Sequence, residues 1–331
     1  MSGHAGTKFA RILLRTHVAE GLAQRNSDAG FSLGPAFAHE LDGDWTTWLG
    51  SIRMEQLADS NLLIEAELPS RAPEILDQDS EDVGRLAHQA FMGLLLARNF
   101  VTFAAPTLLI GARWSRGSSV RKVVSLPQPV HEPAEISSDL QQDQLALAVR
   151  LGDKIVRMSD RRLWRLNRSL HLYRQARCEP DGLERLHQYV RALEGAIKPP
   201  NKGGTTQNFV LRMADLAGEQ HADLFKRLYE RRGAVEHLRE HEILADYSRE
   251  ARLGLVRDEH AAEYLSRMVL ARIVGNDRLS EHFGTADAVD TFWARDAAER
   301  REIWGAPIDP LQAHQGFDPE MLSNDDLNLP A

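Results

Sequence analysis

The chain changes character at the stretch LPQPVHEPAE, residues 126–135, which holds three prolines in ten positions. Proline removes a backbone hydrogen-bond donor and disfavours helix in the residue before it, so such a stretch continues neither a helix nor a central strand. We therefore interpret residues 127–135 as a linker. The chain has 331 residues, which is long enough for a separate hydrophobic core on each side of that linker.

Residues 1–126 combine strand-like and helix-like patterns. The stretches NLLIEAELP (61–69) and SSVRKVVSL (118–126) have the apolar and β-branched composition of strands. Between Val83 and Phe100, apolar residues recur at helical spacing. These patterns predict an α+β domain, to which we assign a sensing or regulatory role.

Residues 136–284 show helical periodicity with only short breaks, which predicts an all-α bundle. A further helix is expected over 285–304. Residues 305–331 are acidic and rich in turn-forming residues, so we expect a flexible tail there. The predicted fold class is thus an α+β N-terminal domain followed by an all-α helical bundle.

Composition favours a cytoplasmic protein. The single cysteine, Cys178, excludes an internal disulfide and a cysteine-based zinc site and fits a reducing compartment. The N-terminus does not resemble a signal peptide. The longest apolar stretch, residues 86–112, is interrupted by Arg98, Asn99 and Pro106, so we expect a buried helix followed by a strand and no membrane span.

Charge is unevenly distributed along the chain. The net charge is −8 overall, but it is −5 for residues 1–140, +4 for 141–270 and −7 for 271–331. The basic middle third indicates an anionic partner for the helical bundle.

The stretch LYERRGAVEHL, residues 228–238, contains two candidate catalytic residues, Arg232 and His237. Five positions correspond to about 140° around a helix axis, so the pair does not share one helix face. Histidine titrates near neutral pH, and arginine offers a fixed fork of donors for phosphate oxygens. RNA carries its own nucleophile, the 2′-hydroxyl, so one proton-transfer group and one cation suffice for a metal-free site.

Together with SLHLYRQARCEPDGLERLHQYVRALEGAI (169–197) and NFVLRMADL (208–216), this stretch resembles the HEPN superfamily, specifically the HEPN domains of bacterial phage-defence and abortive-infection proteins. In that family an arginine and a histidine separated by four to six residues form a ribonuclease site at the cleft of a homodimer. The resemblance implies a metal-independent endoribonuclease of an antiviral or toxin system, with Arg232 and His237 catalytic. It implies no cofactor and no metal.

Other residues receive supporting roles. Glu194 and Tyr229 match the family's pattern, and Glu236 is a candidate ion-pair partner one turn after Arg232. Basic side chains that could contact RNA without reading its sequence are Arg231, Arg161, Arg165 and Arg168. The expected partners are RNA, a second copy of the chain, and a phage-derived trigger or an antitoxin.

Three alternatives stay open. Arg232 could simply pair with Glu236 while His237 is an ordinary core histidine. His237 and His241, four residues apart, could hold a metal ion on one helix face. Gly233 and Leu238 depart from the family's usual residues, which allows a catalytically inactive HEPN-type module that binds RNA or protein.

Overall fold

The computed structural model describes residues 6–36, 43–115, 117–130, 139–158, 163–200 and 204–327. Their contacts form two compact units. The first comprises Met1–Val130 and Ser138–Arg157, and the second comprises His131–Ser137 and Met158–Ala331. None of the described helices is both long and apolar enough to cross a lipid bilayer.

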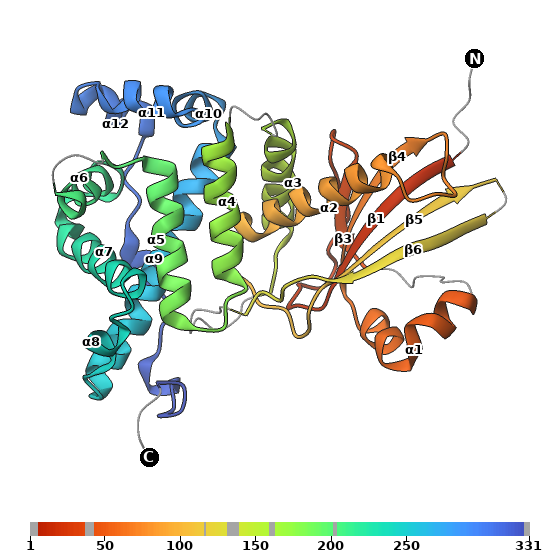
Figure 1. Cartoon of the computed structure of the whole chain (residues 1–331), viewed down its shortest axis with the longest axis horizontal. Helices are drawn as coiled ribbons and strands as arrows, with labels where there is room; N and C mark the ends of the chain where they lie inside the picture. Colours follow the sequence, from red (N-terminus) through yellow and green to blue (C-terminus); the bar gives the residue numbers. More distant parts are fainter. Residues whose placement is uncertain are drawn as a thin grey trace. The chain divides into compact units, whose positions relative to one another are not determined.

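The first unit is built on a six-stranded sheet with the order β2-β3-β4-β1-β5-β6, in which every neighbouring pair is antiparallel (Figure 1). The strands are β1 (Gly6–Leu14), β2 (Arg25–Asn26), β3 (Phe31–Pro35), β4 (Leu62–Ser70), β5 (Thr107–Trp114) and β6 (Gly117–Ser125). The predicted α+β character is confirmed, including strands at both quoted stretches.

Helices cover both faces of this sheet. Helix α1 (Gly43–Ala58) packs Leu57 against Phe9 and Leu13 of β1. Helix α2 (Gln78–Ala97) contacts β1 and β4 and begins at a capping box between Asp77 and Ser80. Because β1 is buried on both sides, its sequence FARILL is apolar apart from Arg11 and does not alternate.

Helix α3 (Gln142–Arg157) packs along α2 and belongs to the first unit. The sequence pattern predicts that this helix is part of the bundle over 136–284, whereas its contacts place it in the first unit, so the predicted boundary at 127–135 lies too early in the chain. Two glycines make the α2–α3 approach possible. A Cβ on Gly93 would lie 2.4 Å from the Ala148 carbonyl oxygen, and one on Gly152 would lie 2.7 Å from the Phe31 ring.

Gly93→Ala is therefore expected to destabilise the first unit by roughly 1–3 kcal/mol, because the added methyl group meets backbone that cannot move alone. Gly254→Ala is the matched control, since Gly254 lies in helix α9 (Arg249–Gly275) with nothing within 4 Å of its added Cβ. That control should stabilise the protein by up to about 1 kcal/mol. Urea unfolding of both variants measures the difference, and equal effects would contradict the close α2–α3 contact.

The second unit is helical, as predicted for this part of the chain (Figure 1). Its first helices are α4 (Trp164–Arg177), α5 (Gly182–Ile197), α6 (Thr205–Ala217), α7 (Ala222–Glu236) and α8 (Glu240–Leu244), with a 3₁₀ turn at Glu219–His221 before α7. Helix α5 contacts α4, α7 and α9. It buries an apolar stripe, which consists of Leu186, Tyr189, Val190, Leu193 and Ile197.

The C-terminal region differs from the prediction in two ways. Residues 285–304 form two helices, α11 (Ala286–Trp293) and α12 (Ala297–Trp304), preceded by α10 (Asp277–Phe283). Residues 305–327 are packed against the bundle, whereas we expected a flexible tail. Two short 3₁₀ helices, Pro310–His314 and Pro319–Met321, each begin at an aspartate cap.

Side-chain contacts hold this C-terminal segment to the bundle. The Arg249 side chain donates to the carbonyls of Pro319 and Leu322, and the His314 ring donates to the Arg257 carbonyl. Leu327 is buried. The turn-forming residues of the segment thus shape its bends instead of keeping it in solvent.

Candidate functional site

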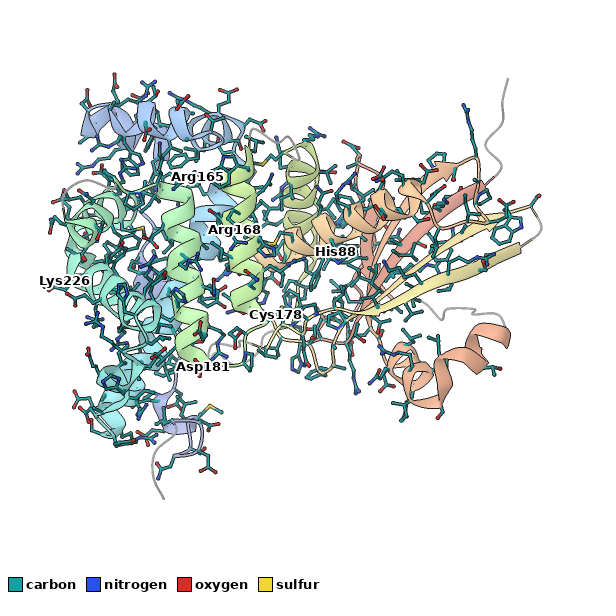
Figure 2. All side chains as sticks on the ribbon, in the orientation of Figure 1. His88, Arg165, Arg168, Cys178, Asp181 and Lys226 are labelled. Carbon is teal, nitrogen blue, oxygen red and sulfur yellow. The ribbon has the colours of Figure 1, made fainter. Side chains whose placement is uncertain are left out.

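Four arginines surround one cavity of about 290 Å³ in the second unit. Arg165 and Arg168 come from α4, Arg191 from α5 and Arg232 from α7. Glu194 is the one carboxylate among the residues that line the cavity. Figure 2 labels Arg165 and Arg168 on the same stretch of α4, far from Cys178 and Asp181. This concentration of positive charge suits an anion such as a phosphate.

Arg232 is held in the cavity by a carboxylate from α5. Its Nε lies 3.1 Å from Oε2 of Glu194, and its guanidinium lies 5.5 Å from the centre of the Tyr229 ring. The Tyr229 hydroxyl donates to the other Glu194 oxygen at 3.0 Å. Tyr229 and Arg232 are three positions apart, which places them on one face of α7. Glu194 thus orients the arginine from the neighbouring helix.

The surroundings of Glu194 fix its orientation further. Burial and the Glu194 charge raise the pKa of Tyr229, so its hydroxyl remains a donor. The Phe209 ring packs 4.9 Å from the Tyr229 ring. Arg165 donates from Nη2 to the Glu194 backbone carbonyl at 3.1 Å, and burial lowers the pKa of Arg165.

The first turn of α6 also reaches the cavity, through Thr205. The residue before it, Gly204, has no side chain to cap the first-turn amides. Such amides and the positive end of the helix dipole favour a negatively charged group. The helix end therefore adds to the field of the four arginines.

His187 is a residue that the sequence reasoning missed. Its Nε2 lies 2.9 Å from Oε2 of Glu236, and the same oxygen lies 3.6 Å from Nη2 of Arg232. The hydrogen bond from His187, followed by the charge of Arg232, lowers the pKa of Glu236. His187, Arg191 and Glu194 recur at spacings of four and three along α5, and this spacing could have identified both His187 and Arg191.

His237 is in a different position from Arg232. It is the C-cap residue of α7, its side chain is exposed, and it does not line the cavity. Leu238 follows with a φ of 54°, the left-handed conformation in which glycine is preferred at a helix end. The amides of Leu238 and Arg239 donate to the carbonyls of Val235 and Ala234, which completes a Schellman motif.

The end of α7 also affects the alternative in which His237 and His241 hold a metal ion. His241 lies in α8, a separate short helix, so His237 and His241 do not share one continuous helix. Within the described ranges, no group of three histidine, cysteine or acidic side chains has an arrangement that could hold a metal ion.

The remaining candidates fall into three groups. Arg165 and Arg168 line the cavity, as described above. Arg231 does not; its Nη1 lies 2.5 Å from Asp258 and donates to the Gly254 carbonyl, so it joins α7 to α9. Arg161 lies outside the described residues.

Comparison with protein-family models, with curated proteins and with solved structures gives no match. The resemblance to the HEPN superfamily therefore remains a prediction from the quoted motifs.

Proposed function

We propose that the chain is a metal-independent endoribonuclease of the HEPN type, acting in a prokaryotic antiviral defence or toxin system. The observation that carries the proposal is the cavity between α4, α5 and α7, where Arg165, Arg168, Arg191 and Arg232 face a single carboxylate. Guanidinium groups bind phosphate oxygens through paired hydrogen bonds, and several of them can follow an RNA backbone without reading its sequence.

The proposed reaction uses the nucleophile of the substrate. The 2′-hydroxyl attacks the adjacent phosphorus as a base removes its proton, and the bond from phosphorus to the 5′-oxygen breaks as that oxygen is protonated. The products are a 2′,3′-cyclic phosphate and a 5′-hydroxyl. Arg232 stabilises the charge on the phosphate oxygens in the transition state, and His237 transfers a proton.

We further propose that each complete site combines residues from two copies of the chain. Within one chain, His237 is exposed at the end of α7 while Arg232 points into the cavity beside Glu194. A two-fold axis near the end of α7 would bring His237 of one copy to the cavity of the other, in both directions at once. The first unit would then sense a phage-derived trigger or bind an antitoxin.

Incubation of the purified protein with RNA in excess EDTA tests the proposed activity. The wild type should cleave and His237→Ala should be slower by roughly 10²–10⁴-fold, the usual contribution of a proton-transfer group. His241→Ala is the matched control, because His241 is an exposed histidine four residues further on. Absence of cleavage by the wild type, or equal rates for the wild type and His237→Ala, would refute the nuclease.

One observation favours a second candidate, an RNA-binding module without catalysis. Arg232 already contacts both Glu194 and Glu236, so part of its charge is neutralised inside the chain. This candidate predicts salt-dependent RNA binding that is weakened by Arg168→Gln, with no new RNA ends formed.

A further inference from the structure

A second, larger cavity of about 830 Å³ lies in the helical unit, between the start of α5, α8, α9 and the segment Leu322–Leu327. It shares no lining residue with the arginine cavity. Its volume falls in the range of small-molecule sites. Apolar side chains form part of its wall, and they are Leu183, Leu186, Leu244, Leu255, Val256 and Leu327.

Most polar groups around this cavity have partners in the protein. Arg185 forms an ion pair with Glu259 and donates to the carbonyls of Glu179 and Pro180 at 2.9 and 2.7 Å. Asp326 accepts from the Ser323 amide at 2.8 Å. These groups are satisfied without a ligand.

Two further groups at the cavity carry no unmatched charge. Burial lowers the pKa of His260 to about 4, so its ring is neutral at pH 7. Asp181 caps α5 by accepting from the Glu184 amide at 2.9 Å. His260 and Asp181 therefore do not need a charged ligand group as a partner.

Arg252 is the exception. Its side chain is buried, with 6% exposure, and it lies against the Tyr247 ring at 5.0 Å. Its Nη2 donates to the Leu244 carbonyl at 2.9 Å, but its Nε has no hydrogen-bond partner and no described carboxylate lies within ion-pair distance. The carboxylate of Asp246 accepts from the Ser248 amide. Hydrogen bonds from Ser248, followed by the charge of Arg252, lower the pKa of Asp246, so this carboxylate acts on Arg252 only from beyond contact distance. A buried guanidinium with no carboxylate in contact is costly, so an anion in the cavity would stabilise it.

The start of α5 supplies a second source of positive electrostatic potential at this cavity. Gly182 and Leu183, the first residues of this 16-residue helix, line the cavity. The Asp181 cap occupies the amide of Glu184, so the amides before it keep their donor capacity. A Cβ on Gly182 would lie 2.9 Å from Oε2 of Glu259, so the end of the Glu259 side chain approaches the start of α5 closely.

We propose that this cavity binds a small organic anion, in which a carboxylate, phosphate or sulfonate group on an apolar body pairs with Arg252. The apolar body lies against the leucines and Val256, and the positive end of α5 adds to the attraction. This site is independent of the proposed ribonuclease activity, because it uses none of the residues of the arginine cavity.

Two fluorescent probes test the proposal on the full chain. 8-Anilinonaphthalene-1-sulfonate carries a sulfonate on an apolar body, and N-phenyl-1-naphthylamine is the same body without the charge. The wild type should bind the sulfonate probe at one saturable site and more tightly than the neutral probe. Arg252→Met, which keeps an unbranched stem but removes the guanidinium, should weaken binding of the sulfonate probe roughly tenfold or more and remove the preference for it.

Two further variants separate binding from folding. Arg257→Met changes an exposed arginine on the same helix and should bind both probes like the wild type. Val256→Phe should fill the cavity and abolish saturable binding. Arg252→Met should also melt no lower than the wild type, since it removes a buried unpaired charge. Undiminished sulfonate binding by Arg252→Met or Val256→Phe, or a lower melting temperature of Arg252→Met with unchanged binding, would overturn the proposal.

Discussion

Arg232→Lys is expected to cleave RNA about 10²–10³-fold more slowly than the wild type, the usual cost of losing one preorganised transition-state donor. Lysine keeps the positive charge but loses the planar fork that meets two phosphate oxygens at once. It also loses the Nε contact to Glu194, which holds the side chain in the cavity. Single-turnover cleavage of a fluorogenic RNA measures the effect.

Arg227→Lys is the matched control for this prediction. Arg227 lies on the same helix, but its Nε and Nη2 both donate to Asp258 at 2.8 Å and it does not line the cavity. The control should therefore cleave at nearly the wild-type rate. If Arg232→Lys also did so, Arg232 would be only a structural ion-pair residue.

Glu263→Gln is expected to lower the free energy of unfolding by about 3–5 kcal/mol, the usual cost of breaking a buried ion pair. The Glu263 carboxylate lies 3.6 Å from Nη1 of Arg177 and 3.0 Å from Nε of Arg267. It also accepts from the Tyr173 hydroxyl at 2.8 Å, and burial raises the pKa of that tyrosine. The variant leaves two guanidiniums in the bundle interior without this carboxylate.

Glu299→Gln is the surface comparison, because Glu299 of α12 pairs at 3.5 Å with Arg295, which precedes that helix. Such an exposed pair contributes about 0–1 kcal/mol. Chemical denaturation measures the free energy of unfolding of both variants and so compares an interior with a surface arginine–glutamate interaction. A loss below about 1 kcal/mol for Glu263→Gln would show that the interior network does not stabilise the bundle.

The sequence pattern was sufficient for the fold class but not for the borders between its parts. The amphipathic pattern of α3 shows that one face is buried, yet it does not say which element buries it. Contacts at Gly93 and Gly152 decide that question, and they depend on three-dimensional approach. The C-terminal segment was predicted to be flexible because it is rich in turn-forming residues. In the structure, its aspartate–proline pairs cap 3₁₀ turns that pack on the bundle, and the sequence alone does not show that packing.

The sequence likewise predicted some residues of the candidate site and missed others. Arg232, Glu194 and Tyr229 were selected from sequence, and they lie in direct contact. Arg191 and His187 were missed although they lie three and seven residues before Glu194 on α5, because the sequence does not show which face of α5 packs against α7. Arg231 was a weaker choice, because adjacent residues on a helix point about 100° apart and its neighbour Arg232 already occupies the cavity face.

The most direct test of the account is to mix two inactive variants, Arg232→Ala and His237→Ala, and to measure RNA cleavage in EDTA. A two-fold dimer of one chain of each kind keeps one intact site, formed by His237 of the first chain and Arg232 of the second. We expect each variant alone to be inactive and the equimolar mixture to recover about a quarter of the wild-type rate per chain, since half of the dimers are mixed and each has one of two sites. A mixture as inactive as its components, with mixed dimers demonstrated by mass spectrometry, would contradict a site shared between two copies.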